Sequence, residues 1–302
     1  MWANPREHSV KQQMRQCYAN IETSKKVANK LAKRIKKDFT EEVMHAKFIS
    51  AIVNEGEFDV SKLQSHLVTS IFIERNKNAN FIVANFVNLR QECKSALLTT
   101  KYVIYEHDHK YLKTRNPAFY KDFIAPQSDI INLEFYQNTL AVLCQSQYHL
   151  DIIKKNIHLS NLVNLSGNLW SLSTLKIIED ISTCSKKDRC SIMNSAIPHK
   201  NTSDAVNLCI AKKFEYDLIH NPVYNDFLAE VGANKKFVFL PKTPETLSRV
   251  AVEARMMNMS LITNNMIGAT KEPWFKLKGK DLIDVVYKMR EDIPSKVIEV
   301  FE

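Results

Sequence analysis

Short apolar runs alternate with segments of helical periodicity along most of this chain. The apolar runs predict strands at Leu67–Ile73, Phe81–Phe86, Tyr102–Tyr105, Ala141–Cys144, Leu162–Leu165, Ser191–Asn194, Tyr216–Ile219, Lys236–Leu240 and Ser260–Thr263. The periodic segments predict helices that include Arg90–Leu98, Ser146–Asn156, Thr202–Lys213, Thr246–Met257 and Lys280–Arg290. This alternation is typical of an α/β protein with parallel sheets.

A polar, turn-rich stretch interrupts the pattern at Ile181–Arg189, and strand-like runs resume after it. A chain of 302 residues is long enough for two domains, since one domain takes about 100–200 residues. We therefore predict one α/β domain over residues 1–183 and a second over residues 184–302.

The net charge of +9 favours a polyanionic partner. Basic residues are concentrated in Ser24–Lys37, which contains no acid and in which apolar residues recur every fourth position. This pattern predicts an amphipathic helix with a basic outer face. That face either is simply solvated or attracts a phosphate backbone, in which case Lys33 and Lys37 are candidate contacts.

Several protein classes lose support from composition. No apolar run reaches the roughly 18 residues of a membrane span, and the first residues lack the apolar core of a signal peptide, so we expect a cytoplasmic protein. Six cysteines without a Cys-x-x-Cys pair argue against structural zinc and a disulfide framework. Five scattered glycines form neither a phosphate loop nor a dinucleotide-binding fingerprint, which argues against kinase, GTPase and dehydrogenase sites.

The strand predicted at Tyr102–Tyr105 runs into a segment of charged and polar residues. That segment contains Glu106, His107, Asp108 and His109, followed by the basic residues Lys110, Lys113 and Arg115. Ligands of open α/β sheets bind at the carboxyl ends of strands, so these side chains are expected at a ligand site. Alternate residues of an extended segment share a face, so at most His107 and His109 could share a metal. A histidine acting as a general base is the better-supported reading, and a hydrogen-bonded polar loop is the alternative.

A second strand–loop–helix unit places Lys200 at the entrance of the helix predicted from Thr202. There its charge would add to the helix dipole and could pair with a diphosphate. The alternative is a lysine exposed to solvent.

The third unit carries two glutamates. A buried strand ends near Leu240, a tight turn follows, and a helix is predicted to open near Pro244, with Glu245 and Glu253 eight positions apart. The first amides of a helix have no intrahelical partner, so such a turn can hold an anion.

Spacing alone is weak support, because about one such pair is expected by chance in a chain of this length and composition. Glu291 and Glu299 have the same spacing, but no apolar strand precedes them, and Pro294 between them is expected to break the helix. The strand–turn–helix setting therefore favours Glu245 and Glu253.

With these residues identified, the chain resembles retaining nucleotide-sugar glycosyltransferases of the GT-B fold, which carry a Glu-x7-Glu motif. The segment Leu240–Arg255 is similar to that motif, and His199-Lys200 is similar to the family's phosphate-binding lysine. Glu106–His109 resembles the family's histidine segment on the acceptor side of the cleft. The likeness is best in the second half of the chain and covers about residues 80–290.

The resemblance implies two Rossmann-like domains facing each other across a cleft, with residues 1–183 on the acceptor side and 184–302 binding the donor. It implies that Glu245 sits by the donor sugar, that Glu253 holds the ribose and that Lys200 holds the diphosphate, with Thr246 and Leu247 as further donor contacts. His107 and His109 become candidate catalytic residues. The expected donor is a UDP-sugar, and no metal or other cofactor is required.

Two positions depart from the family's pattern. The family usually carries an arginine shortly before the lysine, where this chain has Asn194-Ser195, and Asn201 replaces a usual glycine. A second cation for the diphosphate must therefore come from elsewhere.

The acceptor leaves more alternatives open. The net charge and the basic segment suit hydroxymethylated pyrimidines in phage DNA, with Lys33, Lys37, Lys110, Lys113 and Arg115 holding phosphates and the target base flipped out of the duplex. A surface glycan or lipid-linked acceptor is the rival. A membrane-face helix that is both basic and aromatic would favour it, and the basic segment Ser24–Lys37 has no aromatic residue. A non-enzymatic alternative is a nucleic-acid-binding protein in which Glu245 merely complements a helix dipole.

Overall fold

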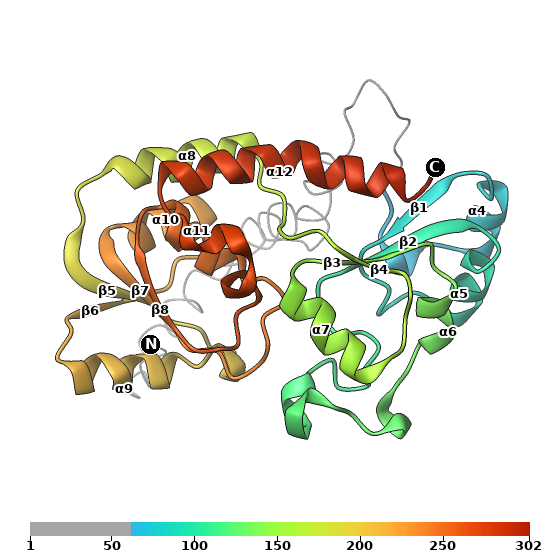
Figure 1. The fold of residues 1–302 in the computed structure, drawn as a ribbon, viewed down its shortest axis with the longest axis horizontal. Helices are drawn as coiled ribbons and strands as arrows, with labels where there is room; N and C mark the ends of the chain where they lie inside the picture. The colour runs from blue at the N-terminus through green and yellow to red at the C-terminus, as the bar shows by residue number, and fades with distance from the viewer. Residues whose placement is uncertain (1–61) are drawn as a thin grey trace, which may run out of the picture. The chain divides into compact units, whose positions relative to one another are not determined.

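Two parallel four-stranded sheets organise residues 62–302, the part of the chain that this computed structural model describes (Figure 1). The first sheet has the order β1-β2-β3-β4. Its strands are β1 (Asn80–Val83), β2 (Lys101–Glu106), β3 (Val142–Cys144) and β4 (Leu162–Asn164). The associated helices are α4 (Ser70–Arg75), α5 (Gln91–Leu97), α6 (Leu133–Gln137) and α7 (Gln147–Asn156).

The centre of the first sheet is buried because β2 and β3 are nearly continuous apolar runs. Tyr102, Val103 and Ile104 of β2 have no exposed surface, and neither does any residue of β3. Helix α7 begins where it does because the Ser146 side chain caps it, accepting a hydrogen bond from the His149 amide at 3.1 Å. The carboxyl ends of β2 and β3 and the amino end of α7 therefore meet at one edge of this sheet.

The second sheet has the order β6-β5-β7-β8. Its strands are β5 (Lys187–Met193), β6 (Tyr216–Ile219), β7 (Asn234–Phe239) and β8 (Ser260–Thr263). The associated helices are α8 (Leu172–Thr183), α9 (Thr202–Lys212), α10 (Tyr224–Gly232), α11 (Arg249–Met256) and α12 (Lys280–Glu299). In Figure 1, α9 lies on one side of this sheet and α10 and α11 lie on the other.

The strand order creates a switch point between β5 and β7. After β5 the chain passes through α9 to β6 on one side, and after β7 it passes through α11 to β8 on the other. The two loops that leave these neighbouring strands therefore run in opposite directions from the carboxyl edge of the sheet. In open α/β sheets, this is where ligands bind.

Most predicted elements are confirmed. The strands at Tyr216–Ile219 and Ser260–Thr263 have the predicted bounds, and the other strands from β1 onward differ by a few residues at their ends. The strand predicted at Leu67–Ile73 is wrong, because Ser70–Arg75 forms α4. The Thr69 hydroxyl accepts a hydrogen bond from the Phe72 amide at 3.1 Å and starts a helix that the apolar run alone does not distinguish from a strand.

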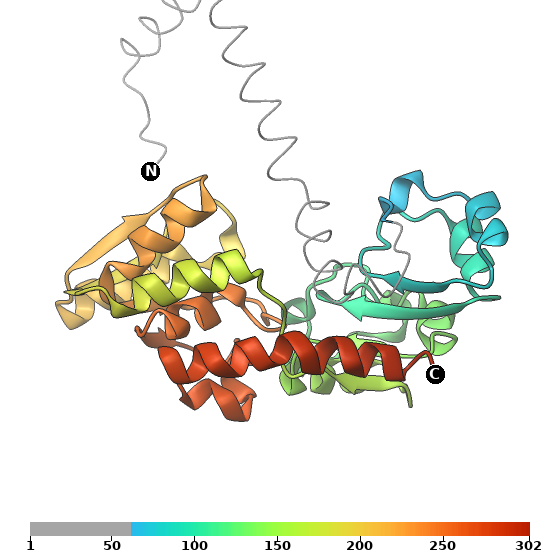
Figure 2. The ribbon, with the colours of Figure 1, turned by 90° about the horizontal axis from the view of Figure 1, so that it is seen from above.

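The helix break predicted at Pro294 is also wrong. Helix α12 continues through Pro294 to Glu299, so Glu291 and Glu299 lie on one helix. Proline removes one helical hydrogen bond, but Ile293, Pro294 and Val297 are all buried, and this packing holds the helix together. Helix α12 packs against α8 and α11 (Figure 2), and beyond its end the Lys101 ammonium donates to the Phe301 carbonyl at 3.0 Å.

The predicted domain boundary between residues 183 and 184 stays a prediction. It falls between the end of α8 and the start of β5, yet the described residues, 62–302, all belong to one compact unit by their contacts. The predicted basic helix Ser24–Lys37, with Lys33 and Lys37, lies outside the described residues. Among the described residues, no helix combines the length and apolarity needed to cross a bilayer.

Candidate functional site

Lys200 and Glu245 meet at the switch point of the second sheet. The Lys200 ammonium lies 2.8 Å from Glu245 Oε1, and the two side chains are 25% and 14% exposed. Lys200 follows β5 and immediately precedes α9, whereas Glu245 lies in the loop between β7 and α11. The ammonium also lies 5.8 Å from the centre of the Phe239 ring. Residues 45 positions apart thus form a partly exposed ion pair at the edge where ligands of such sheets bind.

Glu245 is held by backbone contacts rather than by a helix. Its amide donates to the Met266 carbonyl at 2.7 Å, and its carbonyl accepts from the Gly268 amide at 2.9 Å. Helix α11 begins only at Arg249, so the predicted helix start at Thr246 is wrong by one turn, and its first turn contains no acid. The suggestion that Glu245 complements a helix dipole is therefore wrong.

Gly268 marks the closest approach in this region. A Cβ atom at this position would overlap with the Thr246 carbonyl and with the Ser146 hydroxyl. Ser146 Oγ itself donates to the Thr246 carbonyl at 2.5 Å. Glycine is therefore required where the loop that carries Glu245 meets the amino end of α7.

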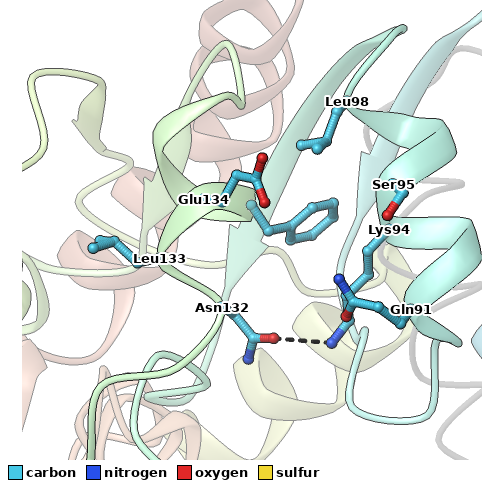
Figure 3. Close-up of a pocket in the computed structure, with 8 residues that line it drawn as sticks. Gln91, Lys94, Ser95, Leu98, Asn132, Leu133 and Glu134 are labelled. Atoms are coloured by element: carbon cyan, nitrogen blue, oxygen red, sulfur yellow. Dashed lines mark hydrogen bonds between the residues drawn. The ribbon is translucent and has the colours of Figure 1, made fainter. Parts of the chain in front are cut away.

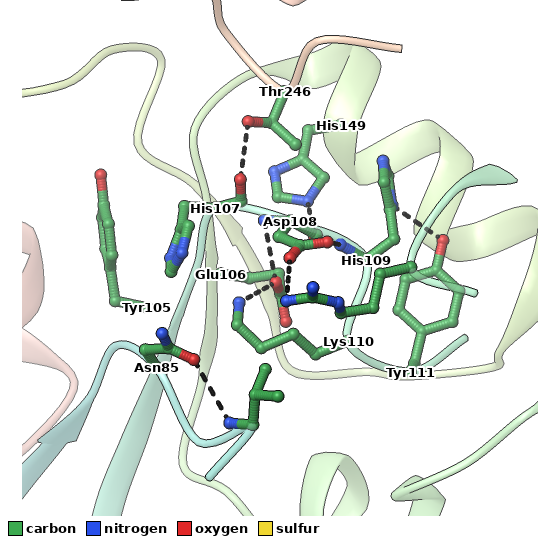
Figure 4. Close-up of polar contacts among 12 residues, drawn as sticks. Asn85, Tyr105, Glu106, His107, Asp108, His109, Lys110, Tyr111, His149 and Thr246 are labelled. Carbon is green, nitrogen blue, oxygen red and sulfur yellow. Dashed lines mark hydrogen bonds and ion pairs between the residues drawn. The ribbon is translucent and has the colours of Figure 1, made fainter. Parts of the chain in front are cut away.

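Thr246 connects this loop to the carboxyl edge of the first sheet. Its hydroxyl lies 2.7 Å from Gln145 Oε1. It also lies 3.2 Å from the His107 carbonyl (Figure 4). Gln145 in turn donates from Nε2 to the Tyr105 hydroxyl at 2.8 Å. Leu247 is buried, and its carbonyl accepts from the Ala269 amide at 3.0 Å. Sequence reasoning missed Gln145, because its partners are about 40 and 100 residues away along the chain.

Glu253 lies inside α11 and is 2% exposed. Its Oε1 accepts hydrogen bonds from the Trp170 indole at 2.9 Å and from the Tyr224 hydroxyl at 2.6 Å. Arg249, one helical turn earlier, places its Nε 3.7 Å from the same oxygen. These protein groups thus occupy part of the hydrogen-bonding capacity of the carboxylate, and a ribose could bind only to the acceptor positions that remain.

Arg249 is a second cation that sequence reasoning missed. It is the first residue of α11, and its side chain is 32% exposed. The guanidinium lies 4.5 Å from the centre of the Trp170 ring and donates to the Leu169 carbonyl at 2.7 Å. Stacking on an aromatic face and a fixed hydrogen bond hold a guanidinium in one orientation, which suits anion binding. Its position between Glu245 and Glu253, inside the glutamate motif, was the available signal.

The two histidines of the first sheet have different surroundings. His107 is half-buried, and its ring stacks beside Tyr105 with ring centres 6.4 Å apart (Figure 4). His109 is 3% exposed, its Nδ1 lies 3.1 Å from the Tyr111 hydroxyl, and burial holds its pKa well below the usual value. His109 is therefore shielded from an acceptor in this structure, and its catalytic role stays a prediction. His107 remains the candidate.

The basic residues after the histidines also need correction. Lys110 is 2% exposed and forms a buried ion pair with Glu106 at 2.6 Å, so it cannot bind DNA or any other surface ligand. Lys113 and Arg115 are about half exposed but pair with Asp129 and Asp108, at 3.6 and 3.2 Å. Neighbouring acids thus reduce the positive charge that the sequence predicted here.

His149 predicts a measurable pH dependence of stability. Burial lowers its pKa to about 3. The neutral ring accepts from the Gln145 amide at Nδ1, and its Nε2 lies 3.1 Å from the Asp108 carbonyl. The unfolded chain binds this proton near pH 6.5, so His149 should cost roughly 2 kcal/mol of stability between pH 6.5 and 5, and more below that.

Urea unfolding at several pH values measures this effect. His149→Asn should reduce the dependence in this window, and the buried His109, whose pKa is also lowered by burial, should account for part of what remains. His158→Asn, which changes an exposed histidine, should preserve the full dependence. An equally steep dependence in the His149 variant would show that other groups cause it.

Glu272, which lies between β8 and α12, contacts residues that follow β3 and β4 of the first sheet. Its Oε1 accepts from the Gln147 amide at 2.6 Å, at the start of α7, and its other oxygen accepts from the Ser166 hydroxyl. The carboxylate is 5% exposed and complements the amino end of the helix. Within the described residues, no three His, Cys, Asp or Glu side chains group as metal ligands would.

A pocket of about 230 Å³ lies away from these residues, between α5 and α6 (Figure 3). It is lined by Gln91, Lys94, Ser95, Leu98, Asn132, Leu133, Glu134 and Phe135. The Lys94 ammonium donates to Asn132 Oδ1 at 2.9 Å, and burial lowers its pKa. The pocket contains none of the predicted site residues.

Fold and site together define an α/β protein with two parallel sheets and a charged site at the switch point of the second. No protein-family model matches the chain, and no curated protein matches it either. Solved structures that it resembles include those of HepE from Anabaena. The HepE structure with UDP and glucose matches with a TM-score of 0.41 and 12% identity, over 71% of each chain.

Two other HepE structures give similar values. The complex with UDP-glucose has a TM-score of 0.37 and 11% identity, over 72% of this chain and 70% of that chain. The complex with UDP has the same score and identity, over 73% of this chain and 74% of that chain. Likenesses at this level do not establish a function, so the proposal below rests on the residues of the site.

Proposed function

We propose that this protein is a glycosyltransferase that uses a nucleotide-activated sugar. The observation that carries the proposal is the Lys200–Glu245 ion pair at the switch point between β5 and β7. The switch point favours a nucleotide ligand. A cation and a carboxylate placed there match the two parts of a nucleotide-sugar, its diphosphate and its sugar hydroxyls. The resemblance of Leu240–Arg255 to the Glu-x7-Glu motif supports the same reading.

The diphosphate would be bound by Lys200 and Arg249. Lys200 supplies a mobile point charge. Arg249 supplies a second, fixed cation, in place of the arginine that the family usually carries where this chain has Asn194-Ser195. Once the diphosphate takes Lys200 as its partner, the Glu245 carboxylate becomes available to accept hydrogen bonds from the sugar. Both cations would then stabilise the charge that develops on the departing nucleotide diphosphate.

The remaining residues have supporting parts in this proposal. Thr246 and Leu247 fix the loop through their hydroxyl and carbonyl contacts. Glu253 holds Arg249, Trp170 and Tyr224 in place and offers its remaining acceptor capacity to the ribose. The half-buried His107 would orient the acceptor hydroxyl or take its proton. Retention of anomeric configuration and a UDP-sugar donor are the outcomes that the family resemblance favours.

The acceptor has two candidate classes. Hydroxymethylated pyrimidine in duplex DNA is supported by the net charge of +9, although Lys110 no longer contributes to it. A surface glycan or lipid-linked glycan is the second class.

A transfer assay tests both the activity and the acceptor. The full chain is incubated with radiolabelled UDP- and GDP-sugars together with duplex DNA containing hydroxymethylated pyrimidines, unmodified DNA, or a lipid extract. We expect label to move from one nucleotide sugar to one acceptor class, with slow hydrolysis of that donor when no acceptor is present. Failure of every nucleotide sugar to bind or to react would contradict the proposed function.

A further inference from the structure

The loop Asn116–Ala125, between β2 and α6, exposes large apolar side chains. Phe119 is 73% exposed and Ile124 is 52% exposed, and they lie only five positions apart. Single exposed apolar residues are common on protein surfaces, but two on one short loop indicate an interaction surface.

The base of this loop is held rigidly. The Asn156 side chain of α7 donates to the Phe123 carbonyl and accepts from the Ala125 amide, both at 2.8 Å. Within the loop, the Asn116 side chain accepts from the Ala118 amide at 3.0 Å. The exposed side chains are thus presented by a fixed backbone.

The backbone of the loop also adopts conformations that most residues avoid. Arg115, Asp122 and Phe123 have φ angles of 53°, 54° and 64°. Such left-handed conformations are uncommon outside glycine, asparagine and aspartate. Backbone strain of this kind persists only where surrounding contacts hold it, and it is concentrated at functional sites.

Exposed lysines lie on the loop itself and on α7, whose Lys155 contacts the loop. Lys121 of the loop and Lys154 and Lys155 of α7 are exposed, and within residues 62–302 none of them forms an ion pair with a carboxylate. The Lys155 ammonium donates to the Asp122 carbonyl at 3.2 Å and lies 5.5 Å from the centre of the Phe123 ring. Asp122 of the loop and Asp151 of α7 are exposed acids, so the surface is mixed, with these two anions against three lysines.

The loop begins next to the proposed active site. At its first residue, Asn116 Oδ1 accepts a hydrogen bond from the hydroxyl of Thr243, two residues before Glu245. Anything bound to the loop therefore lies close to the strand-to-helix turn that carries Glu245.

We propose that Asn116–Ala125 docks the protein on the surface of an anionic lipid bilayer. Phe119 and Ile124 would enter the interface between headgroups and acyl chains, while Lys121, Lys154 and Lys155 would contact the lipid phosphates. The combination of apolar and basic residues favours a bilayer over DNA, which offers no apolar phase for Phe119 to enter. Docking would bring a lipid-linked acceptor to the site, and that last step rests on the proposed function.

Vesicle sedimentation tests the docking without any sugar donor. The full chain is mixed with phosphatidylcholine vesicles with and without about 30% phosphatidylglycerol, at low and high salt. We expect binding to the anionic vesicles that weakens with salt. Phe119→Ser/Ile124→Ser should lower the partition coefficient about tenfold or more. The matched control is Ile210→Ser, which removes a 61% exposed apolar side chain from α9 and should not change binding.

The remaining outcomes are decisive as well. Neutralisation of the lysines, in Lys121→Gln/Lys154→Gln/Lys155→Gln, should reduce binding to anionic vesicles at low salt and change little at high salt. Absence of wild-type binding to either vesicle, or equal binding by the Phe119→Ser/Ile124→Ser variant, would overturn the proposal. The proposal would also be overturned if the lysine variant lost binding to duplex DNA while the apolar variant kept its affinity for vesicles, because this surface would then bind nucleic acid. Because no donor is present, these results are independent of whether sugar transfer is found.

Discussion

Lys200→Met is expected to weaken binding of the nucleotide-sugar donor and to lower its turnover about 100-fold or more. The substitution removes a cation from the diphosphate and leaves Glu245 without the partner that now lies 2.8 Å away. Loss of one preorganised group that stabilises developing charge typically costs about 10²–10³ in rate. Calorimetry with the donor, and then with the free nucleoside diphosphate, measures the binding component, and labelled-sugar transfer measures turnover.

The second sheet contains a matched control for this experiment. Lys236 and Asp188 form an ion pair at 2.7 Å with the lysine 29% exposed, near the amino end of the strands and away from the proposed site. Lys236→Met should leave donor binding unchanged. Glu245→Gln separates the two roles, because it should retain nucleotide binding while sugar transfer falls. If Lys200→Met and Lys236→Met have the same effect on donor binding, the pair at the switch point is structural.

Lys110→Met is expected to lower the free energy of unfolding by about 3–5 kcal/mol. Lys110 and Glu106 are 2% and 0% exposed, and removing one member of a buried ion pair leaves the other charge uncompensated. Glu106 also accepts a hydrogen bond from the Asp108 amide (Figure 4). A further one comes from the Tyr136 hydroxyl, so its carboxylate has several partners that depend on its position. Urea unfolding monitored by circular dichroism measures the change.

The double variant Glu106→Gln/Lys110→Met should recover much of this loss. It removes both charges, the glutamine oxygen can still accept from the Asp108 amide, and the glutamine NH2 group can donate to the Tyr136 hydroxyl, which replaces the bond that Tyr136 now donates. A single substitution costing less than about 1 kcal/mol, in the range of a solvent-exposed pair, would show that water reaches these side chains. The turn after β2 places the His107 carbonyl beside the Thr246 hydroxyl, and the conformation of this turn depends on the Glu106–Lys110 pair. Donor binding should therefore weaken in Lys110→Met as well.

The fold was largely predictable because short apolar runs bounded by polar residues determine the strands. Tyr216–Ile219 and Ser260–Thr263 show this well. Prediction failed where a single local contact decided the outcome. The Thr69 cap turned an apolar run into α4, and buried packing carried α12 through Pro294. Neither effect is visible in periodicity.

The candidate site was predictable only in part. The positions of Lys200 and Glu245 after their strands followed from the sequence, but their pairing depends on the order of β5 and β7, which periodicity does not encode. The burial of His109 and Lys110 was not predictable, because the chain leaves the extended conformation after Glu106 and turns back, so that Lys110 pairs with Glu106 and strand alternation no longer decides which side chains point inward. Arg249 was missed because its role depends on Trp170, far away in the sequence.

A substitution at Gly268 would displace the loop that carries Glu245 without changing any charge. Every side chain, even a methyl group, would push against both the Thr246 carbonyl and the Ser146 hydroxyl. In a saturation library selected for activity, this position should therefore accept almost no replacement, although it binds nothing and ionises nothing. Gly268→Ala would then act as a purely steric wedge, separating the loop that carries Glu245 from α7 while every charged residue of the site remains in the chain.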